Sequence, residues 1–238
     1  MRLNVSLLTV VCALINGIHA FSGKTCRIMP LGASITNGSG SSRGNGYRGT
    51  LYDLLANDGN TVNLVGRQKS GDFHHPHNEG YPGALISEAN QKGQEAMPLM
   101  RPNVATVLVG TNDMLRQVDL AGAPDRLYKL IEDVINWEWL TLVAVATLPP
   151  SPDAGVNDRI NSYNSAIRDV VQRFNDQGRW VVLAEVNAAL TTGDLGPDGI
   201  HPNDGGYERM AKAFYEAIKV GESKGWIADV FGPAPKMD

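Results

Sequence analysis

Cysteine is nearly absent from this sequence of 238 residues, which contains only Cys12 and Cys26. Cys12 lies in an N-terminal stretch that we expect to be removed, so Cys26 is left alone. A protein with a single cysteine forms no internal disulfide, and its stability must come from a hydrophobic core. Because Cys26 falls within an apolar, strand-like segment, we interpret it as a buried thiol and not as a nucleophile.

Long hydrophobic runs are scarce too. One lies near the N-terminus, where residues 1–20 carry a single charge, Val5–Ile15 is almost wholly apolar and Ala20 offers a cleavage point. The run is too short for a comfortable membrane span, and its layout is typical of a secretory signal peptide. We therefore predict a signal peptide over residues 1–20 and an exported protein. The rest, residues 21–238, is predicted to be one domain with a frayed tail from about residue 232.

Clusters of basic residues are lacking as well. The chain has 21 Lys and Arg against 25 Asp and Glu, a formal net charge of −4. A mildly acidic protein of this kind is a poor partner for nucleic acids or anionic membranes. We expect no nucleic-acid partner, no stable membrane association and a monomer. Hydrophobic residues make up 42% of the chain, enough for a sizeable globular core.

From Thr25 onward, apolar segments of strand length alternate with segments of helical periodicity. The expected strands are Thr25–Leu31, Thr61–Val65, Val104–Val109, Leu142–Ala146 and Trp180–Val186. Several are nearly continuous apolar runs, as in parallel strands that helices cover on both faces. In the first one, Pro30 has no backbone N–H, so we expect strand pairing to fail there.

Helical stripes of apolar residues, spaced by three and four, fall between these strands. The clear ones span residues 127–135, 160–174 and 207–218, and weaker ones span 47–55 and 87–100. The alternation predicts an α/β protein built as a three-layer α/β/α sandwich around a five-stranded parallel sheet.

A serine follows the first expected strand almost directly. The strand ends at Gly32, where a tight turn would place Ser34 at the carboxyl edge of the sheet, the edge at which open α/β folds bind ligands. A serine there can also be a simple helix N-cap. Three blocks favour a chemical role, because each follows a later expected strand or lies in a loop beyond one: Gly83, Gly110–Asp113 and Asp198–His201.

Asp198 and His201 lie three residues apart in a loop before the last helix. A loop can fold a carboxylate back onto a ring nitrogen at this spacing. Asp198 would then hold the imidazole of His201 through Nδ1–H and leave Nε2 facing Ser34. The alternative is a turn that only starts the helix, since Asp, Gly, Pro and Asn all favour turns.

Gly83 and Asn112 are candidate donors for an oxyanion hole. When a hydroxyl attacks an ester carbonyl, negative charge collects on one oxygen, and fixed N–H groups stabilise it. The backbone N–H groups of Ser34 and Gly83 and the side-chain amide of Asn112 could converge from neighbouring strand ends. The alternatives are a turn glycine at Gly83 and a helix cap at Asn112.

Two further patterns are weaker. The cluster of His74, His75 and His77 suggests a metal site, but no cysteine or carboxylate repeats nearby at ligand spacing, so we expect no metal there. Asn37-Gly38-Ser39 is an N-glycosylation sequon in a chain that we expect to be exported. It lies just past Ser34, and we expect it to be little glycosylated.

Taken in order, these blocks resemble those of the SGNH/GDSL hydrolases, from Ile28 to about Ile218. The closest pattern is that of fungal secreted members near carbohydrate esterase family 3, the acetyl xylan esterases. The segments that carry this likeness are Leu31–Thr36, Glu79–Gly83 and Asp198–Asn203. One departure is Ala33, where the family's Gly-Asp-Ser motif has aspartate.

The resemblance implies Ser34 as nucleophile, His201 as general base and Asp198 as the residue that orients it. It implies an oxyanion hole formed by Ser34, Gly83 and Asn112. It also implies the SGNH hydrolase fold, with a flavodoxin-like sheet of strand order 2-1-3-4-5, and no metal or other cofactor for the chemistry.

We therefore expect a secreted serine esterase that hydrolyses short acyl esters by an acyl-enzyme mechanism. The expected substrate is an acylated polysaccharide, with acetyl groups on plant cell-wall polysaccharide favoured, or a small ester. One alternative is a lipid acylhydrolase or lysophospholipase on the same fold. Another is a non-catalytic carbohydrate-binding protein, although such a protein has no need for Ser34, Asp198 and His201 together.

Overall fold

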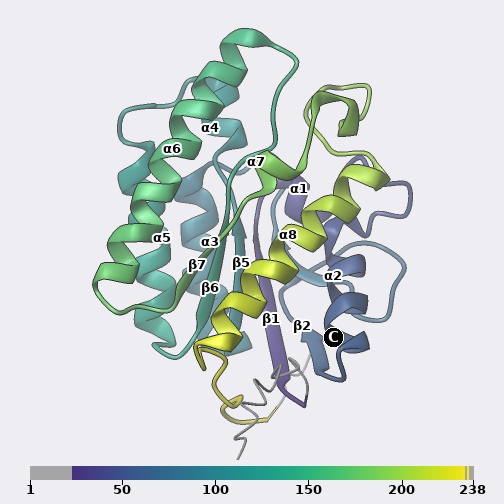
Figure 1. The fold of residues 1–238 in the computed structure, drawn as a ribbon, viewed down its shortest axis with the longest axis vertical. Helices are drawn as coiled ribbons and strands as arrows, with labels where there is room; N and C mark the ends of the chain where they lie inside the picture. The colour runs from purple at the N-terminus through teal and green to yellow at the C-terminus, as the bar shows by residue number, and fades with distance from the viewer. Residues whose placement is uncertain (1–22, 234, 236–238) are drawn as a thin grey trace, which may run out of the picture.

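A mostly parallel sheet forms the centre of the computed structural model, which describes residues 23–233 and 235 (Figure 1). The parallel strands are β1 (Thr25–Gly32), β2 (Thr61–Leu64), β5 (Val104–Leu108), β6 (Leu142–Ala146) and β7 (Val181–Ala184). They pair in the order β2-β1-β5-β6-β7, which is the order expected for the five strands. The predicted α/β fold class is confirmed, whereas the predicted signal peptide lies outside the described residues.

Two strands were not predicted. β3 (Gln68–Lys69) and β4 (His77–Gly80) form an antiparallel hairpin, and β4 pairs in parallel with the end of β1. Within the described residues the sheet therefore has seven strands rather than five. The prediction missed them because β3 has two residues and β4 reads His-Asn-Glu-Gly, which shows no apolar alternation.

Pairing between β1 and β5 does not fail at Pro30, contrary to the prediction. The strand continues to Gly32, and Pro30 is in register with Thr106 of β5. The carbonyls of Ile28 and Gly32 both accept hydrogen bonds on the side of β2 and β4, from Val65 and Tyr81. Pro30 is two residues from Ile28 and two from Gly32, so it faces the same side of β1. It lies between the residues of β1 that pair with β2 and those that pair with β4. Its missing N–H therefore breaks no ladder bond.

Helices cover both faces of the sheet, as the apolar stripes predict. They are α1 (Ser34–Asn37), α2 (Gly46–Asn57), α3 (Ile86–Met100), α4 (Thr111–Arg116), α5 (Ala123–Trp137), α6 (Ala154–Asp176), α7 (Val186–Ala189) and α8 (Asp204–Ser223), with a 3-10 turn at Thr192–Asp194. On one face α2 packs against α8, and on the other α5 lies between α3 and α6 (Figure 1).

The core lies between these layers. Every residue of β5 and β6 is buried, and Tyr47 of α2 stacks on Phe214 of α8 with ring centroids 4.7 Å apart. Cys26 is completely buried, and burial raises the pKa of its thiol to about 12, which agrees with an inert core residue.

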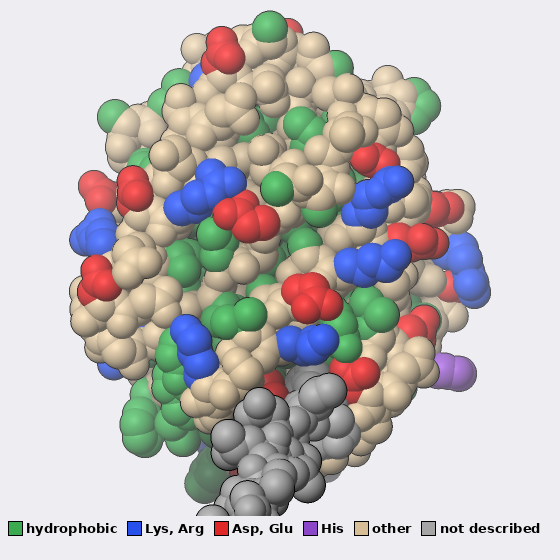
Figure 2. Space-filling model, in the orientation of Figure 1, with side chains coloured by type: hydrophobic (Ala, Val, Ile, Leu, Met, Phe, Trp, Pro, Cys, Tyr) green, Lys and Arg blue, Asp and Glu red, His purple; other side chains and the backbone are tan. Residues whose placement is uncertain are grey.

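The surface shows no large block of one charge on the face drawn in Figure 2, where acidic and basic side chains alternate. Among the described residues, no helix has the length and apolarity needed to span a membrane.

Candidate active site

Ser34 is the first residue of α1 and emerges where β1 ends. The turn that places it there requires glycine at position 32. A Cβ on Gly32 would collide with the backbone carbonyl of Leu108 and with the hydroxyl of Thr36. Ala33, which stands where the family motif has aspartate, is buried, and no side chain caps α1. Ser34 is therefore positioned by the backbone geometry of the turn.

His201 lies against Ser34, although 167 residues separate them in the sequence. Its Nε2 is 2.8 Å from Ser34 Oγ, and its Nδ1 is 2.6 Å from Asp198 Oδ2. Gly40 packs against the side chain of His201, because a Cβ on it would come within 2.7 Å of His201 Cβ. The structure thus brings the three residues singled out in the sequence into one hydrogen-bonded row.

Asp198 is held by more than the imidazole. Its Oδ1 accepts the backbone N–H groups of Ile200 at 2.9 Å and His201 at 3.0 Å, which folds the loop back on itself. Partial burial opposes ionisation of this carboxyl. The hydrogen bonds from the His201 ring and from the two amides outweigh burial and lower the pKa of Asp198 to about 2. Asp198 is therefore an anion at neutral pH, facing the Nδ1–H of the ring.

The turn Tyr81–Ala84 places Gly83 at the same edge of the sheet. The N–H of Ala84 donates to the carbonyl of Tyr81 at 3.0 Å, with Pro82 and Gly83 at the turn's central positions. Gly83 has a φ of 84°, which a turn of type II requires and which favours glycine. Within the described part of the chain, no group accepts a hydrogen bond from the amide of Gly83.

Asn112 is the second residue of α4, but its side chain does not cap that helix. Its Nδ2 donates to the carbonyl of Ala84 at 3.0 Å, so the amide reaches across to the turn that contains Gly83. The helix-cap alternative does not describe this geometry. One of the two Nδ2 hydrogens is used in this bond, and the second remains to bind another acceptor.

The sequence did not identify two buried charged residues, Asp113 and Arg48, that help to position the proposed site. Asp113 accepts bonds from the N–H of Ile86 and from Arg126, both at 3.1 Å, and so ties the start of α3 to α4. Arg48 is completely buried and donates to backbone carbonyls, including that of Asn37 at the end of α1. Charged residues usually lie at the surface, so the sequence gives little sign that Asp113 and Arg48 are buried.

Comparison with known proteins agrees with this geometry. Residues 31–209 match the sequence profile of the GDSL-like Lipase/Acylhydrolase family. The chain belongs to this family. That membership places it among the carboxylic ester hydrolases and confirms the resemblance seen in the sequence.

Several relatives of this GDSL-like protein are esterases by name. A "Multidomain esterase" of Ruminococcus flavefaciens is 30% identical over 224 residues, and the match spans 82% of this chain but only 28% of that protein. A family 3 carbohydrate esterase of Clostridium thermocellum is 28% identical with a TM-score of 0.76, and the match covers 84% of this chain and 99% of that one. A family 3 carbohydrate esterase of Talaromyces cellulolyticus has a TM-score of 0.72 at 20% identity, with coverage of 84% and 99%, and it supports the fold alone.

The histidine cluster is not gathered around one point in this GDSL-like protein. The ring of His75 stacks on Tyr52, with centroids 4.9 Å apart. Burial lowers the pKa values of His75 and His77. No group of three or more His, Cys, Asp or Glu residues suited to a metal ion occurs in the described ranges.

The sequon asparagine lies at the end of α1. Its side chain donates to the carbonyl of Gly80 at 3.4 Å and is half-buried. Its own carbonyl accepts bonds from Arg48 at 2.9 Å and from Ser70 at 2.5 Å. Low glycosylation of Asn37 stays a prediction, and its packing is a reason to expect it.

Proposed function

We propose that this protein is an exported serine esterase that removes short acyl groups, with acetyl esters of plant cell-wall polysaccharide as the favoured substrate. The observation that carries the proposal is the hydrogen-bonded row from Ser34 Oγ through His201 to Asp198, with separations of 2.8 and 2.6 Å. This is the arrangement in which a histidine can take the proton of a serine hydroxyl while a carboxylate stabilises the imidazolium.

In the proposed reaction, Ser34 Oγ bonds to the acyl carbon and its proton passes to Nε2 of His201. The carbonyl electron pair moves to oxygen, which gives a tetrahedral oxyanion. The bond to the alcohol then breaks, and the alcohol leaves with the proton from Nε2. Water attacks the acyl-Ser34 ester, gives a proton to Nε2, and releases the free acid as Ser34 regains its proton.

The oxyanion would be bound by the N–H groups of Ser34 and Gly83 and by the amide of Asn112. What supports this is the bond from Asn112 to Ala84, which fixes the amide beside the turn of Gly83. Donors that are already oriented need no reorganisation as charge develops on the oxygen.

The preference for a short acyl group is proposed from the family resemblance, and a narrow crevice lined by sequence neighbours of the proposed site residues is compatible with it. The crevice has a volume of about 10 Å³, and its walls include Leu115, Thr111, which precedes Asn112 in the sequence, and Ile200, which precedes His201. A space of this size admits one group about as large as a water molecule or a methyl. A carbohydrate substrate is proposed from the name of the Clostridium thermocellum relative, a family 3 carbohydrate esterase, and the choice of a polysaccharide from the resemblance to the acetyl xylan esterases.

The test uses purified protein and p-nitrophenyl acetate, butyrate and palmitate, with acetate release from acetylated xylan measured alongside. We expect the acetate ester and acetylated xylan to be hydrolysed, diisopropyl fluorophosphate to label Ser34, and Ser34→Ala to lose at least ~10³-fold in rate while it keeps the fold. Faster hydrolysis of palmitate would replace the proposal with a lipid acylhydrolase. Absence of both labelling and turnover would leave a binding protein.

Export is proposed from the pattern of residues 1–20. Expression of the full-length chain in a secreting host, followed by mass spectrometry of the N-terminus, tests it. A mature protein that begins near residue 21 in the medium supports export, and an intact Met1 in the cytosol contradicts it.

A further inference from the structure

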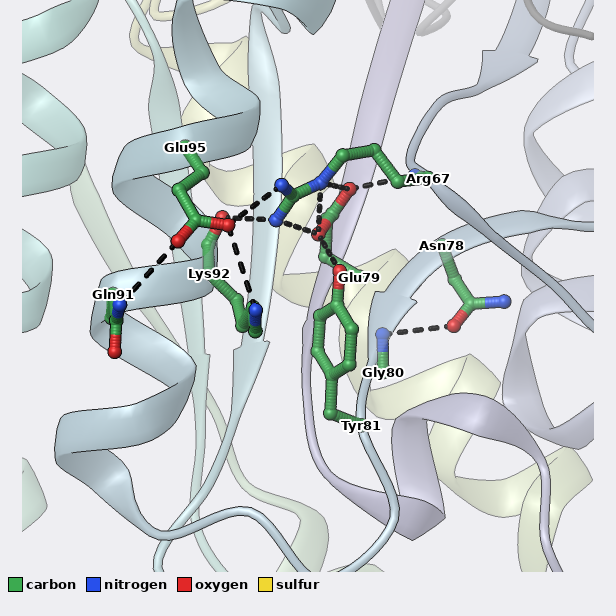
Figure 3. A network of polar contacts seen from close by, with 8 residues as sticks. All are labelled: Arg67, Asn78, Glu79, Gly80, Tyr81, Gln91, Lys92 and Glu95. Carbon is green, nitrogen blue, oxygen red and sulfur yellow. Dashed lines mark hydrogen bonds and ion pairs between the residues drawn. The ribbon is translucent and has the colours of Figure 1, made fainter.

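A buried carboxylate lies directly beside the proposed active site. Glu79 of β4 is completely buried, and Arg67 binds it through its backbone N–H at 2.6 Å and through its guanidinium at 3.1 to 3.3 Å (Figure 3). Arg67 also binds Glu95 and the carbonyl of Lys92, both at 2.8 Å, and so anchors the pair to α3. A buried charge without such partners would be strongly destabilising, so this network fixes the place of Glu79.

Glu79 has one more partner, the phenol of Tyr81. Tyr81 Oη donates to Glu79 Oε2 at 2.7 Å, and Figure 3 shows its ring lying along β4 so that the hydroxyl reaches the carboxylate. Burial, followed by this bond to Glu79, raises the pKa of Tyr81 to about 12, so the phenol keeps its proton at neutral pH. The ring of Tyr81 is therefore attached at its far end to the Arg67–Glu79 pair.

The backbone of Tyr81 connects this network to the nucleophile. Its N–H donates to the carbonyl of Gly32 at 3.0 Å, at the turn that presents Ser34. Gly80, in register with Gly32, touches α1 so closely that a Cβ on it would come within 2.5 Å of the backbone nitrogen of Asn37. The segment from Glu79 to Tyr81 thus forms one wall of the nucleophile turn.

Tyr81 is also the first residue of the turn that contains Gly83, one of the proposed oxyanion donors. The carbonyl of Tyr81 accepts the N–H of Ala84, and the carbonyl of Ala84 accepts the side-chain amide of Asn112. Gly83 and Asn112 are therefore both located relative to Tyr81. Pro82 is exposed and Gly83 has no side chain, so neither residue anchors the turn to the core.

We propose that Arg67, Glu79 and Tyr81 form a positioning network for the oxyanion hole, in which the hydroxyl of Tyr81 fixes the turn that presents the N–H of Gly83 and the amide of Asn112. None of the three residues is placed here in contact with the reacting atoms. The inference rests on the proposed function, since it concerns donors that act only when an oxyanion forms.

The network should therefore affect the transition state more than substrate binding. Without the hydroxyl, the main-chain bonds of Tyr81 remain, but its ring is no longer held by the buried carboxylate. Small displacements of groups that stabilise a transition state lower kcat strongly and change KM little.

The test compares Tyr81→Phe with Tyr215→Phe. Tyr215 is a matched control, because its hydroxyl donates to Asp58 at 2.6 Å, a bond of the same kind outside the site, between α8 and the end of α2. With p-nitrophenyl acetate, we expect Tyr81→Phe to lower kcat about tenfold with KM within about twofold, and Tyr215→Phe to keep kcat within about twofold. The rate of inactivation by diethyl p-nitrophenyl phosphate, which also places charge on an oxygen, should fall in parallel for Tyr81→Phe alone.

Glu79→Gln supplies the second arm. If both changes act through one bond, the double variant should lose no more in kcat than the more impaired single variant. Equal kcat values for Tyr81→Phe and Tyr215→Phe, or a lowered melting temperature of Tyr81→Phe with kcat unchanged, would overturn the inference while leaving the esterase proposal in place. A wild-type protein without turnover or Ser34 labelling would instead reject the proposed function itself.

Discussion

At the scale of single residues, the candidate site depends on polar groups whose hydrogen-bond partners are already in place. Asp198 receives two backbone amides and the imidazole, and Asn112 is held by Ala84. Pre-oriented groups of this kind can stabilise developing charge without rearrangement. Substitutions at these positions should therefore affect the rate of reaction and the stability of the fold to different degrees.

Asn112 should affect the rate far more than substrate binding. If its free amide hydrogen binds the oxyanion, Asn112→Ala should lower kcat by roughly 10² to 10³ with little change in KM. Asn90→Ala is a suitable control, since it removes an amide bonded to Asp133 at 2.9 Å between α3 and α5. A kcat for Asn112→Ala within a few-fold of wild type would remove Asn112 from the proposed oxyanion hole.

Asp198 should make stability depend on pH in acid. Its pKa of about 2 in the folded protein lies below the value of about 3.9 in an unfolded chain, so the unfolded state binds more protons in that range. The stabilising contribution is therefore complete above about pH 5 and is lost as the pH falls from about 4 towards 2. Urea unfolding of the wild type and of Asp198→Asn should show a stability difference that shrinks over that window. A difference that stays constant down to pH 2 would contradict this account.

At the scale of elements, the site is assembled where β1, β4 and β5 end and the next segments begin. α1 carries Ser34, the turn after β4 carries Gly83, and α4 carries Asn112. Parallel strands place their carboxyl ends at one edge, so residues far apart in the sequence meet there. His201 comes to the same edge from the loop before α8.

The helix α4 should also set the acyl-chain length. Leu115 lines the crevice of about 10 Å³ whose walls include the sequence neighbours of Asn112 and His201, and Leu115→Ala should enlarge it. Each additional methylene that becomes buried contributes about 0.8 kcal/mol, so the butyrate-to-acetate ratio of kcat/KM should rise about fourfold per methylene. Leu120→Ala, a partly buried leucine outside that crevice, is the control. The same ratio in both variants would show that the acyl group binds elsewhere.

At the scale of the whole molecule, the described chain holds its site by packing and hydrogen bonds. The sheet is covered on both faces, and Cys26 is a free thiol within the core. Charges of both signs are mixed over the face in Figure 2, and the formal net charge is −4. The face in Figure 2 therefore shows no concentrated positive charge of the kind that binds nucleic acids or anionic membranes.

Metal removal should leave activity unchanged. The proposed chemistry uses protein groups alone, and the ring of His75 is stacked on Tyr52. Rates with p-nitrophenyl acetate before and after dialysis against a chelator provide the measurement. A loss of rate that zinc reverses would reveal a catalytic metal, whereas a loss of melting temperature that calcium reverses would reveal a structural ion.

The sequence by itself determined the alternation of strands and helices and the positions of the chemically active blocks. Nearly continuous apolar runs such as Val104–Leu108 report burial on both faces. The spacing of Asp198 and His201 is local, because one loop holds both residues. Local patterns of this kind can be read without knowing where the rest of the chain lies.

Only the tertiary structure decided how distant polar groups meet. The β3–β4 hairpin has no apolar pattern and forms because β1 offers it an open edge beyond β2. Pro30 is tolerated because it faces the gap between β2 and β4 along the edge of β1. The burial of Glu79 and the direction of the Asn112 amide depend on partners 12 and 28 residues away. Hydrophobic periodicity indicates which residues are buried, but not which polar groups they contact. A buried polar group is stable only where the fold supplies its hydrogen-bond partners.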